Sequence, residues 1–138
     1  YRDFAHAPSK LRATAEAAKQ QFPGRRLVAC LEIHTFSSLD PAFLKQYAHT
    51  FHAPDAAAVY YDPAVSRHKQ LPVLDEAAIQ TAFERADLRV FSDAAALRHW
   101  LEAQPWHDKN LLMMSSGTFG GLDLPALART LTQPTHTP

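Results

Sequence analysis

The fold is decided by the stretch DFAHAP at residues 3–8, which places a strand end, a polar loop and a helix start side by side in the sequence. Phe4 and Ala5 are expected to close a short buried strand. Pro8 suits the first turn of a helix, because a residue there needs no N–H for the helical hydrogen bonds. Asp3 and His6 are therefore predicted at a strand-to-helix corner, where open α/β sheets place ligand-binding groups.

Strands and helices are predicted to alternate along the rest of the chain. The expected strands are apolar without strict alternation, which is typical of strands covered on both faces. They are residues 2–5, 26–33, 56–61, 88–91 and 110–115. This alternation favours βαβ units with right-handed crossovers. We predict an α/β fold, a three-layer sandwich with a mostly parallel, Rossmann-like sheet of about five or six strands and helices on both faces.

The helices are predicted from their start and stop signals. Residues 9–21 carry apolar side chains at helical spacing, and Pro23-Gly24 stops that helix. Further helices are expected after aspartate or serine caps, at residues 42–51, 64–69, 76–83 and 94–103. A last helix is predicted at residues 122–131, and residues 132–138 are expected to form a disordered tail.

Composition limits the classes of partner. The 14 basic and 14 acidic residues cancel without any run of like charge, which argues against nucleic acid or a membrane surface. Cys30 lies in an apolar run and is interpreted as a small core residue in a reducing compartment, so we expect a cytoplasmic protein. Because the sequence begins with Tyr1, we also expect it to be a fragment of a longer chain, with residues 1–131 forming one domain.

Polar residues follow the ends of the predicted strands. Because the carboxyl ends of parallel strands point into one crevice, these residues are candidates for the site, whatever the reaction. They are His6 after the first strand, Glu32, His34, Thr35, Ser37 and Ser38 at the end of the second, Tyr61 and Asp62 after the third, and the run beginning at Ser115 after the last.

The loop SSGTFGG at residues 115–121 carries three of the four glycines of the chain. Glycine allows close backbone approach to a ligand, and successive N–H groups can form a nest for a carboxylate or phosphate. An ordinary Gly-rich turn between strand and helix is the alternative. The loop lacks the Lys-Ser/Thr ending of a phosphate-binding loop. We therefore expect that this chain cannot by itself bind a nucleoside triphosphate and its magnesium ion.

Histidine is abundant, but only His6 and His34 fall at strand ends. His49 and His52 are predicted three residues apart on one helix, where they are expected to be exposed. A metal site needs a third ligand that the sequence does not supply, so no metal site is predicted. Nucleophilic catalysis is also disfavoured, because the sequence shows no recognisable Ser-His-acid pattern and Cys30 is expected to be buried.

The corner at residues 3–8 resembles the Asp-Tyr/Phe-Ala/Gly-His-x-Pro corner that opens the C-terminal domain of the Mur ligases, ATP-dependent enzymes that build the peptidoglycan peptide. The resemblance covers nearly the whole chain, from this corner to the final strand and its Ser-Ser-Gly loop. Two stretches, PGRRL at residues 23–27 and LMMSSGTFGGLD at residues 112–123, are most similar to the murein peptide ligase branch.

The resemblance implies an amide ligase that joins UDP-N-acetylmuramate to L-Ala-γ-D-Glu-meso-diaminopimelate through an acyl-phosphate. It implies that ATP and Mg²⁺ are held mainly by a central domain, and the UDP-sugar by an N-terminal domain, of the same chain. This domain would bind the incoming peptide and part of ATP, and by itself it would be inactive. Domain closure would bring the substrates together.

The resemblance also implies roles for individual residues. Asp3 matches the acid that accepts hydrogen bonds from the ATP ribose, and His6 matches a catalytic-loop histidine that faces the reaction centre. Ser115, Ser116 and Gly117, with Phe119, correspond to the segment that holds the carboxylates of the incoming substrate.

The chain departs from its relatives in two places. Ala7 stands where many have a second histidine, and LEIHT at residues 31–35 replaces a Glu-Pro-Arg type of turn. His34, Ser37 and Ser38 are therefore predicted to bind substrate in place of that arginine. Two alternatives stay open, a UDP-N-acetylmuramate–alanine ligase domain and a non-catalytic nucleotide- or peptide-binding module.

Overall fold

A computed structural model describes residues 2–3, 8–33, 44–62, 76–115 and 119–132 of the chain. Within these residues, five strands form one sheet in the order β1-β5-β2-β3-β4. They are β1 (Arg2–Asp3), β2 (Arg26–Glu32), β3 (Ala56–Tyr60), β4 (Arg89–Phe91) and β5 (Lys109–Met114). Every described pairing is parallel, which confirms the predicted sheet.

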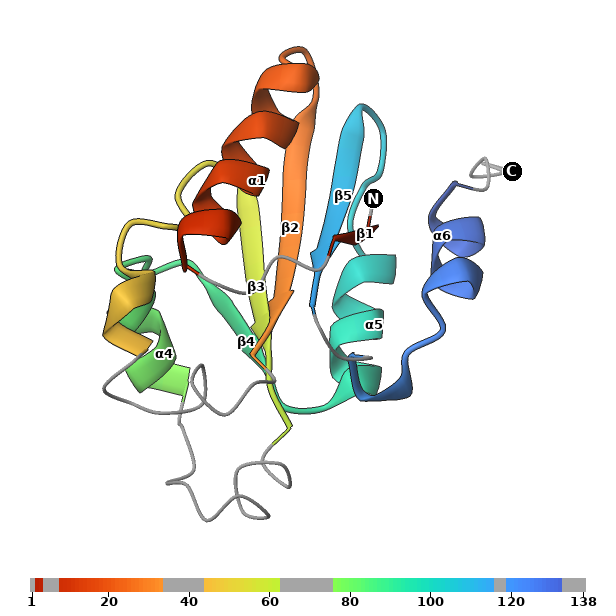
Figure 1. Ribbon diagram of the computed structural model, residues 1–138. Coiled ribbons are helices and arrows are strands. Elements are labelled where there is room, and N and C mark those ends of the chain that lie inside the picture. Colours follow the sequence, from red (N-terminus) through yellow and green to blue (C-terminus); the bar gives the residue numbers. More distant parts are fainter. Residues whose placement is uncertain (1, 4–7, 34–43, 63–75, 116–118, 133–138) are drawn as a thin grey trace.

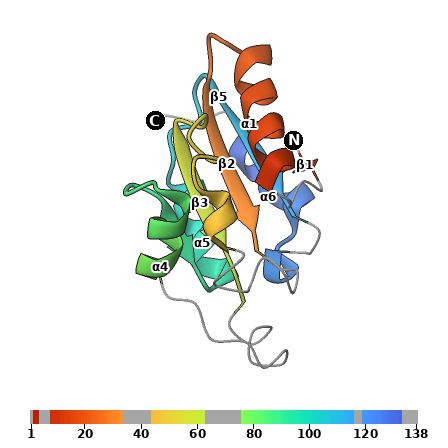
Figure 2. The same ribbon diagram turned by 60° about the vertical axis from the view of Figure 1, so that its left-hand side comes forward.

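Helices cover both faces of the sheet (Figures 1 and 2). On one face lie α1 (Pro8–Gln21), the 3₁₀ turn η1 (Lys45–Tyr47) and α4 (Glu76–Phe83). On the other lie α5 (Ala94–Glu102), the short turn η2 (Phe119–Gly121) and α6 (Leu124–Thr132). The three-layer α/β sandwich predicted from the sequence is confirmed.

The central strand β2 shows why both faces are covered. Leu27 and Leu31 belong to the core under α1 and α4, whereas Val28 and Cys30 belong to the core under α5 and α6. A strand that is apolar on both faces must be buried on both. Burial raises the pKa of the Cys30 thiol, so this residue packs as a small apolar side chain, as predicted.

Local signals set most helix ends. The chain leaves α1 through a turn in which the Arg25 N–H donates to the Phe22 carbonyl at 3.0 Å, around the predicted Pro-Gly stop. Asp93 caps α5 by accepting from the Ala95 N–H at 3.3 Å, as predicted. Asp123 caps α6 by accepting from the Ala126 N–H at 3.0 Å, so α6 begins two residues later than predicted.

The helix predicted at residues 42–51 is wrong in its second half. Among the described residues 44–51, Leu44 is α-helical and the 3₁₀ turn Lys45–Tyr47 follows it. This turn ends where the Thr50 N–H and hydroxyl both donate to the Tyr47 carbonyl, at 3.1 and 2.6 Å. His49 takes a left-handed φ of 62°, which an α-helix excludes. His49 and His52 are therefore not on one helix, and the helix predicted at residues 64–69 lies outside the described residues.

Candidate functional site

The strand ends meet at one edge of the sheet, which we call the carboxyl edge. Asp3 at the end of β1 is in register with Met114 at the end of β5, and Met114 is in register with Leu31 of β2. Glu32 is in register with Tyr60 at the end of β3. The backbone therefore brings the predicted positions Asp3 and Ser115 to the same edge, as the parallel topology requires.

Glu32 is the central polar group of this edge. Its side chain is buried, with the residue 3% exposed. One carboxylate oxygen, Oε1, accepts a hydrogen bond from the Ser115 hydroxyl at 2.5 Å and another from the Phe119 N–H at 2.9 Å. Both are charge-assisted bonds, which are shorter and stronger than neutral ones. Glu32 therefore ties the end of β2 to both ends of the segment that follows β5.

The chain turns sharply after this attachment. Phe119, Gly120 and Gly121 have consecutive left-handed φ angles of 51°, 67° and 83°. A Cβ added to Gly120 would lie 2.3 Å from the Tyr60 hydroxyl oxygen, so only glycine fits there. The Phe119 ring is buried and packs on Tyr60, with the ring centroids 6.2 Å apart. Two neighbouring strand ends, those of β2 and β3, thus hold the turn in place.

Acidic groups surround the Tyr60 phenol. Burial raises its pKa above the ordinary value near 10, and the nearby carboxylates of Asp62, Glu32 and Asp93 raise it further. Tyr60 is therefore neutral over the physiological pH range.

The predicted site residues fall into two groups. His6, His34, Ser37, Ser38, Ser116 and Gly117 lie outside the described residues. Ser115 and Phe119 lie at the carboxyl edge with buried side chains, and Asp3 joins the same edge through its backbone pairing. Their roles in catalysis, nucleotide binding and substrate binding stay predictions.

Glu32 and Tyr60 are the residues whose importance sequence reasoning missed. The sequence marks Glu32 as a polar residue at a strand end but indicates no role for it. The available signal was a charged residue within the apolar run LVACLEI at residues 27–33, because a buried carboxylate is costly unless it is hydrogen-bonded. Tyr60 gives no comparable signal, because a tyrosine is ordinary in a buried strand.

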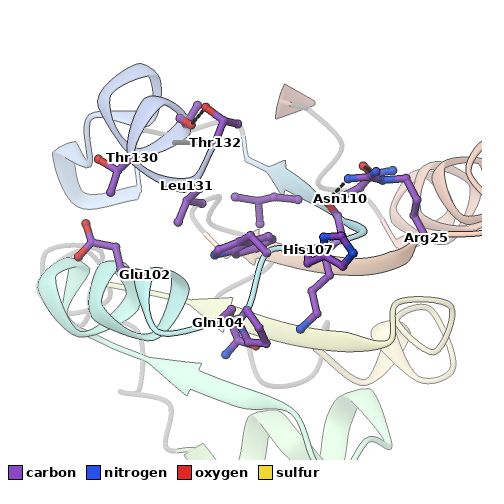
Figure 3. Close-up of a pocket in the computed structure, with 13 residues that line it drawn as sticks. Arg25, Glu102, Gln104, His107, Asn110, Thr130, Leu131 and Thr132 are labelled. Atoms are coloured by element: carbon purple, nitrogen blue, oxygen red, sulfur yellow. Dashed lines mark hydrogen bonds between the residues drawn. The ribbon is translucent and has the colours of Figure 1, made fainter. Parts of the chain in front are cut away.

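A groove of about 750 Å³ lies at the opposite end of the sheet, the amino edge (Figure 3). Its walls come from the starts of β2 and β5 and from the last residues of α5 and α6, including Arg25, Asn110, Glu102 and Thr132. Arg25 donates to the Asn110 side-chain oxygen at 2.9 Å and to the Lys109 carbonyl at 2.8 Å. These bonds tie the starts of the two strands together.

The histidines that the structure describes do not form a metal site. His49 contacts Glu84 at 2.6 Å, and its ring packs edge-on against His52, with the centroids 5.4 Å apart. His49 is exposed, as predicted. Within residues 8–33, 44–62, 76–115 and 119–132, no three His, Cys, Asp or Glu side chains gather closely enough to hold a metal ion.

Curated relatives identify the family. No protein-family model matches the sequence. A UDP-N-acetylmuramate–L-alanine ligase of Roseiflexus castenholzii is 31% identical over 115 residues, which is 83% of this chain and 24% of that protein. Another from Streptococcus suis is 37% identical over 79 residues, 55% of this chain and 18% of that protein.

The chain belongs to the Mur ligase family. It spans about a quarter of the length of the Roseiflexus relative.

Solved structures share the fold of this Mur ligase chain. A murein peptide ligase from Psychrobacter arcticus superposes with a TM-score of 0.75 at 19% identity, over 98% of this chain and 28% of that one. A domain ascribed to a UDP-N-acetylmuramate:L-alanyl-γ-D-glutamyl-meso-diaminopimelate ligase of Haemophilus ducreyi gives 0.62 at 21% identity, over 94% and 89%. Among the described helices, none has the length and apolar character needed to cross a membrane.

Proposed function

We propose that the chain is the C-terminal domain of a cytoplasmic, ATP-dependent ligase of peptidoglycan synthesis or recycling. The proposed reaction joins UDP-N-acetylmuramate to the amine of L-Ala-γ-D-Glu-meso-diaminopimelate. The observation that carries the proposal is the carboxyl edge, where Glu32 holds Ser115 and Phe119 at the end of β5 in a chain of Mur ligase descent. In open parallel sheets this is the edge that binds ligands.

The proposed chemistry has two steps. A muramate carboxylate oxygen attacks the γ-phosphorus of ATP, ADP leaves, and an acyl-phosphate forms. The uncharged amine then attacks the acyl carbon, inorganic phosphate leaves, and the nitrogen loses a proton as the amide forms. Both steps depend on holding the reactants together, so positioning is the main task of the protein.

This domain is proposed to contribute binding groups rather than the phosphate-binding loop. Asp3 would accept hydrogen bonds from the ATP ribose, because a carboxylate offers only acceptors to a pair of hydroxyls. His6 would act at the reaction centre on the phosphate or the amine. The segment from Ser115 through Gly117 to Phe119, with His34, Ser37 and Ser38, would bind the incoming peptide.

ATP and Mg²⁺ are proposed to be held mainly by a central domain of the same chain, and UDP-N-acetylmuramate by an N-terminal one. Asp3 and the Glu32-bound segment are compatible with peripheral contacts to a nucleotide and to a peptide.

A UDP-N-acetylmuramate–L-alanine ligase is the second candidate. It is favoured by the names of the relatives with 31% and 37% identity. The two candidate ligases differ only in the amine substrate, which is the tripeptide for the first candidate and free L-alanine for the second.

Phosphate release by the full-length protein that contains this chain distinguishes the candidates. With ATP and UDP-N-acetylmuramate present, we expect release when the tripeptide is added and little when L-alanine replaces it. Release with L-alanine alone would establish the second candidate. Release with neither amine would refute both and favour a module that binds without catalysis.

A further inference from the structure

Glu32 joins two points of the chain through one oxygen. The Ser115 hydroxyl and the Phe119 N–H both donate to Oε1, at 2.5 and 2.9 Å. Ser115 directly follows β5, and Phe119 opens the left-handed turn at residues 119–121. A single side chain from β2 therefore fixes where this segment leaves the sheet and where it turns back toward α6.

A carboxylate at this position is not what packing alone favours. The neighbours of Glu32 in β2 are apolar on both faces, and burying a charge is unfavourable unless its hydrogen bonds are satisfied. The burial of Glu32 is compatible with folding because its Oε1 accepts hydrogen bonds from two buried donors. Only a side chain with an acceptor at the reach of glutamate makes both bonds.

The turn that Glu32 holds is unfavourable by itself. Phe119 is not a glycine, yet it adopts a φ of 51°, a conformation that side chains disfavour. Its N–H bond to Glu32 and the packing of its ring on Tyr60 compensate for this strain. Loss of the Glu32 oxygen removes one of these two restraints and leaves the aromatic contact in place.

We propose that Glu32 is a positioning residue for the incoming amine substrate. It acts through Ser115 and Phe119, whose placement at the carboxyl edge sets the geometry of substrate binding. Glu32 itself is 3% exposed, so it is buried beneath the surface at which a substrate would bind. This inference rests on the proposed function, because it concerns the substrate that the proposed ligase takes at this edge.

Two substitutions in the full-length protein separate positioning from other roles. Glu32→Gln keeps a carbonyl oxygen at the same reach, so both bonds persist without the charge, whereas Glu32→Ala removes the acceptor. We expect Glu32→Ala to raise KM for the amine substrate about tenfold or more, with KM for ATP and for UDP-N-acetylmuramate changed by less than about twofold. Glu32→Gln should stay within about threefold of the wild type.

Control variants test the route of the effect. Glu16→Ala removes an exposed glutamate of α1 that pairs with Arg12 on the same helix, and it should leave every KM unchanged. Ser115→Ala should raise KM for the amine in the wild type but add little in the Glu32→Ala background, because both changes remove the same bond. Full additivity would show that Ser115 acts independently of Glu32 and would contradict a role of Glu32 exercised through Ser115.

Three results would overturn the inference. If Glu32→Ala raises all three KM values equally, the variant has lost structure generally and the inference fails. If Glu32→Ala does not fold, the three KM values are measured for Ser115→Ala instead. A Glu32→Gln variant as impaired as Glu32→Ala would show that the charge is required. If Glu32→Ala ligates with an unchanged KM for the amine, the proposed role of Glu32 is rejected. If the wild-type protein ligates no amine, the proposed function is rejected instead.

Discussion

The two ends of the sheet differ in what their polar residues do. At the carboxyl edge, Glu32 is buried and holds Ser115 and Phe119 in a turn that fits only glycine at residue 120. At the amino edge, Arg25 and Asn110 border an open groove of about 750 Å³ and bond to each other at 2.9 Å. The groove therefore lies at the opposite end of the sheet from the buried Glu32.

The proposed function places ligand binding at the carboxyl edge, away from this groove. A parallel sheet places its strand-to-helix loops at one edge, and those loops carry the residue types that bind ligands. The groove at the amino edge lies between helix ends and strand starts, where Trp106 donates to the Leu101 carbonyl and Arg25 links two strands. These contacts stabilise the fold.

The largest expected effect is at Gly120. Gly120→Ala should lower the free energy of unfolding of the 138-residue chain by about 3 kcal/mol, because the new Cβ would meet the Tyr60 hydroxyl at 2.3 Å in a left-handed backbone. Gly121→Ala is the matched control, because its φ is also left-handed but its Cβ would meet nothing within 4 Å. It should cost about 1 kcal/mol. If urea unfolding gave the same loss of unfolding free energy for Gly120→Ala and Gly121→Ala, the tight contact at Tyr60 would be refuted.

The second effect compares one hydrogen-bonded pair at each edge. Glu32→Leu should destabilise the chain by about 2 kcal/mol, since it leaves the Ser115 and Phe119 donors buried without their acceptor. Asn110→Ala at the amino edge should cost less than about 1 kcal/mol, because Arg25 is exposed enough to bond water. The expectation would be contradicted if urea unfolding showed a larger loss of unfolding free energy for Asn110→Ala than for Glu32→Leu.

The third effect is a loss of stability at high pH. Because the folded pKa of Tyr60 lies above its unfolded value near 10, stability is intact below pH 10 and falls as pH rises toward the folded pKa, by at most about 1.4 kcal/mol per pH unit. Tyr60→Phe should reduce the fall in the free energy of unfolding above pH 10. Urea unfolding between pH 8 and pH 11 measures it, and identical slopes for the two proteins would contradict the acidic surroundings of Tyr60.

The smallest effect is at low pH and belongs to the amino edge. Burial alone would raise the pKa of Asp55, but hydrogen bonds from Lys19 and from the Leu27 N–H outweigh it and lower the pKa. The contribution of Asp55 is therefore present above its ordinary pKa near 3.8 and is lost as pH falls through the folded pKa. Asp55→Asn should narrow the stability difference between pH 6 and pH 2. An unchanged difference would show that Asp55 is not paired in solution.

Local signals made much of the fold predictable, and long-range contacts limited the rest. Pro23-Gly24 and Asp93 act on their immediate neighbours, so α1 and α5 could be placed from the sequence. The end of η1 could not, because the left-handed His49 and the bonds of Thr50 to the Tyr47 carbonyl leave no compositional signal. The partners of Glu32 are 83 and 87 residues away in the sequence, so only the folded sheet reveals them.

Hydrogen–deuterium exchange on the full-length protein tests most directly whether the carboxyl edge binds the incoming amine. The protein would be compared with ATP analogue and UDP-N-acetylmuramate bound, before and after addition of the tripeptide. We predict new protection of backbone amides at residues 115 and 119–123, and no change at residues 102–108 and 128–132 beside the groove. Protection confined to the groove, or none at either edge while the enzyme turns over the tripeptide, would contradict the account.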